Sequence, residues 1–228
     1  MIYNKDFREV IKELDKEKTL IIIDPPYNVG WKYDTYKDNL SEQQYTELFT
    51  HFAGFKLVII HYIEDIIKYV VPIMGTPEKV VQWVYNSNMR KQHRSIAFFN
   101  CNPDFSKVKQ KPKNPEDVRV NSEVNIYDWW NVNLVKNVSK EKENYSNQIP
   151  EKVIGNIIKT TANDEVIFDA FMGSGTTLAV ASKLGFEYMG CDISEKAFEI
   201  TKQRLKEIIK EELENSQNEP DQLEEIDL

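Results

Sequence analysis

Short apolar runs alternate with amphipathic stretches along most of the chain. The apolar runs are rich in β-branched residues and stop at polar residues or prolines, which is typical of strands buried on both faces of a sheet. They predict strands at residues 19–23, 55–61, 80–85, 95–100, 165–168 and 188–191. Between them, apolar residues spaced by three or four predict helices. These helices lie at residues 6–16, after a capping Ser41, and at residues 63–71, 150–160, 176–184 and 194–214.

This alternation predicts an α/β fold with an open, mostly parallel sheet that helices cover on both faces. In such folds, ligands bind outside the carboxyl ends of the strands. Two polar segments follow predicted strands at such ends, at residues 24–27 and 169–177. Residues 102–144 are rich in Pro, Lys, Asn and Asp and predict a long insertion. We therefore expect a binding site where the two polar segments meet.

The chain has 228 residues, of which 41% are hydrophobic and 29% charged, and this length predicts one domain or one domain with an insertion. No apolar run approaches the roughly 20 residues that span a membrane, and residues 1–18 are too charged for a signal peptide. Cys101 and Cys191 stand far apart, and the histidines lack the spacing of metal ligands. We therefore expect a cytoplasmic protein without zinc or disulfides, and we exclude secreted and membrane classes.

The charge is distributed unevenly. The formal net charge is −8, but residues 210–228 hold eight carboxylates against the single base Lys210. That segment accounts for −7 of the total of −8, so the body before it carries only about −1. A block of like charges with few apolar groups predicts a solvated tail without regular structure. The acidic balance therefore does not argue against an anionic partner for the body.

One stretch of the body, residues 86–113, is locally basic, and Asp104 is its only acidic residue. Lysine and arginine supply sequence-independent affinity for phosphates, and the aromatic residues that interleave this stretch can stack on bases. The alternative is a solvated loop face, so other features must decide between the two. The candidate nucleic-acid contacts are Arg90, Lys91, His93, Arg94, Lys107, Lys109, Lys111 and Lys113.

Residues 166–177 combine a predicted strand, a glycine turn and the start of a helix. Gly173 and Gly175 let the backbone approach a ligand, and Asp192 ends the next strand, where an acid can bind a ribose. A P-loop would need a lysine after Gly175, and a dinucleotide site would need a third glycine where Leu178 stands. S-adenosylmethionine has a ribose and no phosphate, so it suits this turn better. A packed turn without a ligand is the other interpretation.

Asp24, Pro25, Pro26 and Tyr27 directly follow the first predicted strand. An exocyclic amino group is a poor nucleophile because its lone pair is delocalised into the ring. The Asp24 carboxylate and the Pro25 carbonyl can accept its two N–H groups and so favour a pyramidal nitrogen that can attack a sulfonium methyl group. Tyr27 offers a flat face to an extruded base. A rigid turn explains the prolines but not the flanking Asp and Tyr.

These four residues resemble the D-P-P-Y motif of the amino-methylating DNA methyltransferases. Residues 168–177, Phe-Asp-Ala-Phe-Met-Gly-Ser-Gly-Thr-Thr, are similar to the family's cofactor motif L-D-P-F-x-G-S-G-T-T, with Ala170 in place of proline. Residues 147–150, Asn-Gln-Ile-Pro, resemble the H-P-x-Q-K-P element without its His and Lys. With smaller likenesses at residues 184–185, 188–192 and 204–205, the resemblance covers most of 1–34 and 144–206.

The catalytic motif precedes the cofactor motif, an order that resembles the β class of these enzymes. The resemblance implies a Rossmann-like S-adenosylmethionine-methyltransferase fold in circularly permuted form. It divides the chain into a catalytic half (1–85), a target-recognition region (86–144), a cofactor-binding half of the same domain (145–209) and an acidic tail (210–228). It also favours DNA contact over a solvated face for the basic stretch.

The resemblance further implies a set of cofactor-binding residues. They are Asp6, Asp24, Ser146, Asn147, Gln148, Asp169, Phe171, Gly173, Ser174, Gly175, Thr176, Thr177 and Asp192. Within this set Asp192 is expected on the ribose, Asp6 near the adenine, and residues 146–148 with Asp24 at the methionine end. The chemistry needs no metal and no covalent intermediate, so we expect neither cysteine to be a nucleophile and His61 to be a hydrogen-bonded core residue.

The function that the resemblance implies is methyl transfer from S-adenosylmethionine to the N6 amino group of a flipped-out adenine in double-stranded DNA, because Asp rather than Ser heads the tetrapeptide. N4-cytosine methylation uses the same site and stays open. A nicotinamide-dependent oxidoreductase and a catalytically inactive DNA-binding protein are alternatives from other classes. A prokaryotic or viral cytoplasm, a homodimer and a cognate restriction endonuclease are further expectations, and no membrane association is expected.

Overall fold

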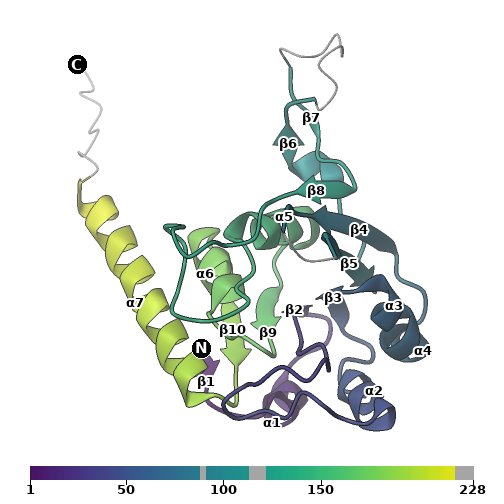
Figure 1. Ribbon diagram of the computed structural model, residues 1–228. Helices are drawn as coiled ribbons and strands as arrows, with labels where there is room; N and C mark the ends of the chain where they lie inside the picture. The colour runs from purple at the N-terminus through teal and green to yellow at the C-terminus, as the bar shows by residue number, and fades with distance from the viewer. Residues whose placement is uncertain (88–90, 113–121, 219–228) are drawn as a thin grey trace, which may run out of the picture.

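The computed structural model describes residues 1–87, 91–112 and 122–218, with only the backbone for 216–218 (Figure 1). Its centre is an eight-stranded sheet in the order β1, β10, β9, β2, β3, β5, β4, β8. In that order the strands are Ile2–Tyr3, Tyr188–Cys191, Val166–Asp169, Thr19–Ile23, Lys56–His61, His93–Phe99, Lys79–Val84 and Trp129–Asn131. All neighbours are parallel except that β5 runs antiparallel to β3 and β4. The predicted open, mostly parallel sheet is confirmed.

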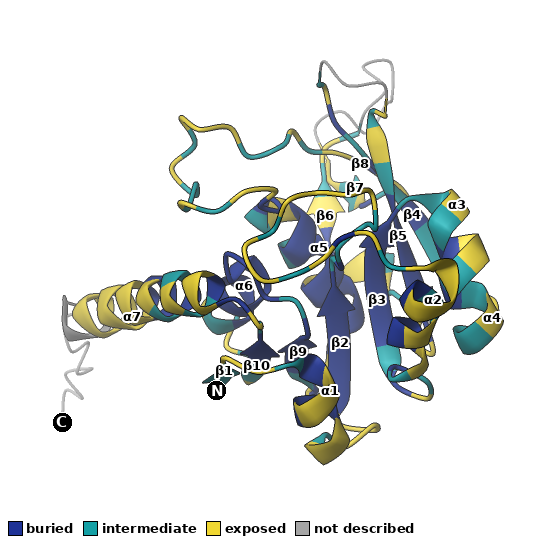
Figure 2. Ribbon diagram, turned by 60° about the horizontal axis from the view of Figure 1, so that its bottom comes forward, coloured by how far each residue is buried: buried dark blue, intermediate teal, exposed yellow. Residues whose placement is uncertain are grey.

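The central strands are buried on both faces, which explains their continuous apolar sequences. In β2, Leu20 and Ile22 enter one core while Ile21 and Ile23 enter the other, as the pleat of a strand requires. The first core lies under α5 (Glu151–Thr161) and α6 (Thr176–Lys183). The second lies under α1 (Phe7–Val10), α2 (Glu42–Thr50), the π-helix η2 (Ile66–Val70) that follows α3 (Ile63–Asp65), and α4 (Val71–Met74). Figure 2 shows the buried strands between these helices.

The helices follow the predictions from the sequence, with two differences in their bounds. Ser41 caps α2 in a full capping box with Gln44, as predicted. The first helix, predicted over residues 6–16, is shorter, because α1 continues only as the 3-10 helix η1 (Ile11–Glu13) and Leu14 is extended. Pro150, expected in the first turn of its helix, is the N-cap of α5.

Helix α7 (Glu195–Asn218) extends into the acidic tail. The helix predicted over residues 194–214 is confirmed and continues to Asn218, so the tail from Lys210 onward, which we expected to lack regular structure, is helical in its first part; residues 219–228 lie outside the described residues. Glutamate and lysine are good helix formers, and Lys210 pairs with Glu214 one turn later at 3.6 Å. Local helix propensity therefore outweighs like-charge repulsion over this part of the tail. Figure 1 shows the yellow end of α7 projecting from the sheet.

The insertion predicted over residues 102–144 adds structure at one edge of the sheet. It supplies β8, which pairs with β4, the 3-10 helix η3 (Phe105–Lys107), and the antiparallel pair β6 (Lys109–Gln110) and β7 (Val124–Asn125). Figure 1 shows this pair at the top, on the side away from α1 and α2. Within the residues described, no helix is long and apolar enough to cross a membrane.

Candidate functional site

The two polar segments singled out in the sequence meet at one edge of the sheet. Strands β2 and β9 are adjacent and parallel, with Ile21 opposite Phe168, so Asp24 and Asp169 stand at neighbouring strand ends. Both segments line one cavity of about 650 Å³, a volume in the usual range for ligand sites. The cavity walls include all four residues of the tetrapeptide and every predicted cofactor-binding residue except Gly175.

Hydrogen bonds and a ring stack hold the tetrapeptide in place. The Tyr27 hydroxyl donates to Asp24 Oδ1 at 2.6 Å, and its ring stacks on His61 with 4.1 Å between the ring centroids. The Tyr45 hydroxyl donates to the Pro26 carbonyl at 2.7 Å. These contacts fix the turn in addition to the restriction that two prolines place on the backbone.

His61 is the hydrogen-bonded core residue that the sequence predicted. Its Nδ1 accepts from the Tyr62 N–H at 2.8 Å, and its Nε2 lies 2.8 Å from the Tyr45 hydroxyl. Since that hydroxyl donates its proton to Pro26, Nε2 carries the proton of the ring. Burial lowers the pKa of His61 to about 3, so the ring is neutral and its 3.3 Å contact with Asp65 is not an ion pair.

Asp24 is half-buried and lies beside Arg94. Burial raises the pKa of Asp24, and Arg94 and Tyr27 oppose that rise. Arg94 Nη1 lies 3.7 Å from Asp24 Oδ2. Burial disfavours the charged guanidinium, but Tyr27 and Asp24 favour it, and the pKa of Arg94 is raised overall. The cation therefore stays charged and favours the ionised carboxylate.

Asp169 organises the start of the glycine turn. Its carboxylate accepts the Phe171 N–H at 2.9 Å, and burial raises the pKa of Asp169 to about 7, against hydrogen bonds from Thr177 and Phe171 that lower it. The Phe171 ring lies 5.1 Å from that of Phe7. This pair forms an aromatic part of the site next to Asp6, whose carboxylate caps α1 and pairs with Arg8 at 2.6 Å.

The two glycines are required by the backbone of the turn. Gly173 has φ of 49° and Gly175 has φ of 74°, in the left-handed region that other residues rarely adopt. The Gly173 N–H donates to Asp192 Oδ2 at 3.0 Å, and its carbonyl accepts from Thr201 at 3.1 Å. A Cβ on Gly175 would lie 2.7 Å from the Thr201 side chain. Gly175 therefore allows the turn to pack closely against Thr201, while Gly173 lines the cavity.

Arg204 ties the turn to two helices. Its Nη1 donates to the Ser174 carbonyl at 2.9 Å and to Thr176 Oγ1 at 3.1 Å, and its Nη2 donates to Glu151 at 2.8 Å. A buried arginine whose donors are used in this way has a structural role. Arg204 therefore fixes the position of Ser174 relative to α5 and α7.

The segment 146–148, predicted to hold the methionine end of the cofactor, lies on the cavity wall, but Gln148 makes hydrogen bonds within its own loop. Its Oε1 accepts the Glu143 N–H at 2.9 Å, and its Nε2 donates to the Glu141 carbonyl at 2.5 Å. Ser146 and Asn147 are exposed at the cavity, and Asn147 has φ of 57°. Gln148 therefore holds the loop, and Ser146 and Asn147 are the members of this segment with free access to a ligand.

The sequence reasoning missed the loop at residues 28–40, of which Val29, Trp31 and residues 33–36 line the cavity. The buried Asp38 accepts three backbone N–H groups of this loop at 2.7–3.0 Å. At the far side of the cavity, the Ser194 hydroxyl donates to Asp34 at 2.8 Å. The turn-forming residues of this segment predict a loop, but they do not predict that the loop lines the cavity.

Tyr145 is a second residue that the sequence reasoning missed. Its ring packs on the glycine turn, because a Cβ on Gly173 would lie 3.0 Å from it. The Lys142 amine donates to the Tyr145 carbonyl. Only its position next to residues 146–148 could have drawn attention to it, since the surrounding segment has no periodicity.

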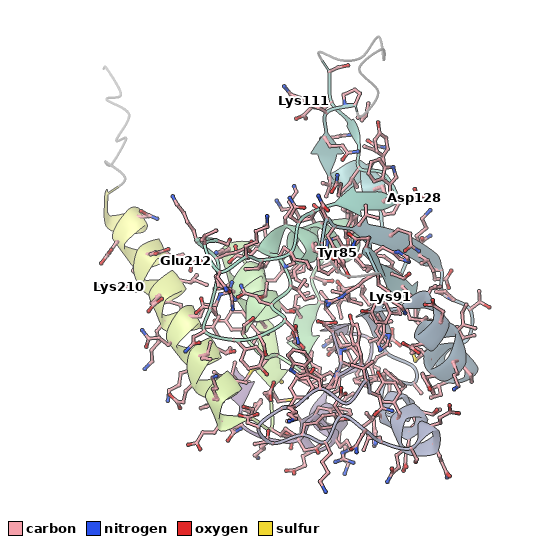
Figure 3. The ribbon with its side chains drawn as sticks, viewed as in Figure 1. Tyr85, Lys91, Lys111, Asp128, Lys210 and Glu212 are labelled. Atoms are coloured by element: carbon pink, nitrogen blue, oxygen red, sulfur yellow. The ribbon has the colours of Figure 1, made fainter. Side chains whose placement is uncertain are left out.

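The predicted DNA contacts fall into two places. Lys91 and Arg94 line the cavity, and His93 is exposed at the start of β5. The amines of Lys107 and Lys109 contact Asn163 and Asn125 beside the β6–β7 pair. Figure 3 shows Lys91 near the middle of the molecule and Lys111 at its top. Arg90 and Lys113 lie outside the described residues.

Neither cysteine has the surroundings of a nucleophile. Burial raises the pKa of the half-buried Cys101 to about 12 and also raises that of the buried Cys191, so both stay thiols at neutral pH. Across the part of the chain that is described, no three His, Cys, Asp or Glu residues gather into a group that could hold a metal ion.

Residues 51–203 match the N6/N4 methyltransferase family model, which is described as DNA methylase. The tetrapeptide at residues 24–27 lies before this match. The Type II methyltransferase M.HpaI of Haemophilus parainfluenzae is 27% identical over 229 residues, which cover 86% of this chain and 71% of that relative. The match therefore spans most of both proteins.

Two solved structures share the fold. The M1.HpyAVI–SAM complex superposes with a TM-score of 0.59 at 23% identity, covering 90% of this chain and 98% of that one. The PvuII DNA methyltransferase, which is cytosine-N4-specific, superposes with a TM-score of 0.66 at 13% identity, covering 92% of this chain and 89% of that one. At these identities the likeness establishes the architecture.

Proposed function

The chain belongs to the DNA methylase family of N6 and N4 methyltransferases, and on that premise we propose that it methylates the N6 amino group of adenine in double-stranded DNA, with S-adenosylmethionine as the methyl donor. The observation that carries the proposal is the shared cavity, in which Asp24 of the tetrapeptide faces the same space as the glycine turn at Gly173. A nicotinamide-dependent oxidoreductase would leave the tetrapeptide without a role, and the family excludes it.

The chemistry of the cavity fits S-adenosylmethionine. Five aspartates line it, Asp6, Asp24, Asp34, Asp169 and Asp192, which suits a ligand with a cationic sulfonium and an amino group. Asp192 would hold the ribose, Phe171 with Asp6 the adenine, and Ser146 and Asn147 the methionine end. When bound, S-adenosylmethionine supplies a methyl group on a positively charged sulfur.

The tetrapeptide prepares the target nitrogen. Tyr27 engages Asp24 Oδ1 at 2.6 Å, so Oδ2 is the oxygen that accepts one N–H of the amino group, and the Pro25 carbonyl accepts the other. Both bonds favour a pyramidal nitrogen with its lone pair outside the plane of the base. The methylated nitrogen then loses its extra proton to Asp24 Oδ2. Tyr27, supported on one face by His61, packs against the base.

The basic residues supply the affinity for DNA in this proposal. Lys91 stands at the cavity, and Lys111 lies on the β6–β7 side of the molecule (Figure 3), so the phosphate backbone would pass across the edge of the sheet that holds the site. A flipped nucleotide then reaches the tetrapeptide. We extend to this chain the Type II setting named for M.HpaI, with a cognate restriction endonuclease in a bacterial cytoplasm. A homodimer stays a prediction for light scattering to test.

Single-molecule sequencing of DNA from cells that express the protein tests the function. We expect N6-methyladenine in one short sequence context, absent from cells with an empty vector. N4-methylcytosine in its place would overturn the adenine assignment and keep the methyltransferase. Absence of both marks from a protein that binds S-adenosylmethionine in calorimetry would indicate the inactive DNA-binding alternative.

A further inference from the structure

Arg94 extends from β5 into the part of the cavity formed by Asp24 and Tyr27, which we call the base subsite. The side chain is only 16% exposed, and Nη1 lies 3.7 Å from Asp24 Oδ2. The guanidinium carbon lies 5.1 Å from the centroid of the Tyr27 ring and 5.4 Å from that of Trp83. A planar cationic donor therefore lies against both groups that the proposed reaction assigns to the target base.

Arg94 uses only part of its hydrogen-bonding capacity, with the Tyr85 hydroxyl as a side-chain partner. Its Nε is buried without a hydrogen-bond partner, and its distance to Asp24 is longer than a hydrogen bond. Arg204 is the contrast within the same protein, because its Nη1 and Nη2 donate to Ser174, Thr176 and Glu151 at 2.8–3.1 Å. An arginine with an unused buried donor is costly, which indicates a functional reason for its position.

Arg94 is the cation among the groups that face Asp24. Tyr27 comes from the same turn, Tyr33 from the loop at residues 28–40, Tyr85 from the end of β4 and Asp169 from β9. The tyrosines are neutral and Asp169 is an acid. Lys91 contacts the Tyr62 ring at 3.6 Å and Glu64 at 3.8 Å instead. Among the residues that the structure describes, no cation other than Arg94 lies beside the half-buried Asp24.

The reaction is incompatible with a guanidinium that stays at this place. Methylation moves positive charge onto the target nitrogen, and a fixed cation next to that nitrogen would oppose the change. The amino group also needs the Asp24 oxygen that Arg94 faces. We propose that Arg94 stands in for the target amino group in the empty base subsite and withdraws from Asp24 when the base enters. This inference rests on the proposed function.

The test compares the pH dependence of kcat/KM for DNA with that of kcat, using a duplex that carries the site found by sequencing. The first reports ionisations of the free enzyme and the second those of the complex. For Arg94→Gln we expect the acid limb of kcat/KM to move to higher pH, with a loss of about ten-fold near pH 6.5 that largely recovers near pH 8.5, while the acid limb of kcat keeps its position. Arg94→Lys, which keeps the charge, should restore most of the kcat/KM profile.

Two outcomes would overturn the proposal. A shift of both profiles together would show that Arg94 stays beside Asp24 during catalysis, and no shift in either would show that it is not the counter-ion of Asp24. Lys79→Gln on the neighbouring strand β4 removes a charge that pairs with Asp128 at 3.1 Å and should change neither profile. Circular dichroism and calorimetric binding of S-adenosylmethionine check that the variants are folded.

A second readout follows the base itself. In a duplex with 2-aminopurine at the target position, extrusion of the base raises the fluorescence. Arg94→Gln should keep this rise at high pH, and loss of it would show that Arg94 holds the base instead of standing in for it. Absence of methylation by the wild-type protein on every duplex would refute the proposed function instead, before any variant is compared.

Discussion

The Ser194 hydroxyl donates to the Asp34 carboxylate at 2.8 Å, across 160 positions of sequence. This bond joins the loop at residues 28–40, which directly follows the tetrapeptide, to the chain just after Asp192. Both residues line the cavity, so the bond connects two segments of its wall. The loop that positions the catalytic side is thus linked to the side that would hold the cofactor.

Loss of this link should weaken cofactor binding more than it weakens the fold. For Asp34→Ala we expect the Kd for S-adenosylmethionine, measured by calorimetry, to rise about three- to ten-fold, which corresponds to one hydrogen bond to a charged group. The melting temperature should change little because Asp34 is exposed. Lys32→Ala, an exposed change in the same loop, is the control. An unchanged Kd for Asp34→Ala would show that the link does not shape the site.

Asp24 should be indispensable for methyl transfer and dispensable for cofactor binding. Asp24→Ala removes the acceptor for the amino group, and we expect activity to fall below detection in a filter assay with tritiated S-adenosylmethionine. Cofactor affinity should stay within about three-fold of wild type, because the glycine turn and Asp192 are untouched. Asp128→Ala, an exposed acid before β8, should leave activity unchanged. Residual activity near the wild-type level in Asp24→Ala would refute the assigned role.

The Tyr45 hydroxyl should contribute to both stability and rate. Tyr45→Phe leaves the Pro26 carbonyl and His61 Nε2 without the partner that they share at 2.7 and 2.8 Å. We expect the free energy of unfolding in urea to fall by about 1–3 kcal/mol, with a lower kcat because the tetrapeptide is less firmly held. Tyr3→Phe removes a hydroxyl that contacts the Met1 sulfur at 3.7 Å, and this change should cost less than about 0.5 kcal/mol. Equal stability of the two variants would contradict this account.

A comparison of alanine variants at Gly175 and Gly185, at the two ends of α6, distinguishes the cost of backbone strain from the cost of steric crowding. Both have positive φ, 74° and 75°, but a Cβ on Gly175 would meet Thr201 at 2.7 Å while one on Gly185 would meet nothing within 4 Å. Gly185→Ala should cost about 1–2 kcal/mol of unfolding free energy from φ alone. Gly175→Ala should cost clearly more and should also weaken cofactor binding. Similar losses in thermal denaturation would show that Thr201 can move aside.

Asp169 should make the fold less stable as the pH rises. Burial raises its folded pKa to about 7, above the value of about 3.9 in unfolded chains. The folded state therefore binds the proton more tightly, and the stabilisation that this gives below about pH 4 is lost as the pH rises through about 7. Asp169→Asn removes this dependence. The unfolding free energy of the wild type minus that of the variant should decrease as the pH rises from about 4 to about 7. An increase of this difference over the same range would contradict the direction of the pKa shift.

The parts of the site that are contiguous in sequence could be predicted from it. Asp24 to Tyr27 and the turn from Asp169 to Thr177 each follow an apolar strand. The rule that ligands bind at the carboxyl ends of parallel strands was enough to expect them together. The same reasoning identified Ser41 as a helix cap, because a capping box is a local pattern.

The contacts that complete the site depend on tertiary packing and leave no local pattern. Tyr45 of helix α2 contacts Pro26 in the turn after β2, and Tyr145 of an irregular segment contacts Gly173. Arg94 was predicted as a DNA contact from the charge of its neighbourhood. Its position beside Asp24 follows from the pairing of Ser95 with His61 in the sheet, which no sequence pattern specifies. Composition indicated the acidic tail, and the apolar spacing that predicted a helix to residue 214 showed that its first part is helical.

The reversed direction of β5 has a consequence for how new specificities can arise. Because β5 enters the sheet at the edge where the other central strands leave it, with His93 paired to Val84, the short connection between β4 and β5 begins and ends beside the reactive groups. Under the proposed function, a change of sequence at the described ends of that connection would alter what meets an incoming duplex, while the tetrapeptide and the glycine turn are encoded elsewhere. Target preference and methyl-transfer chemistry can therefore diversify independently within a chain of this size.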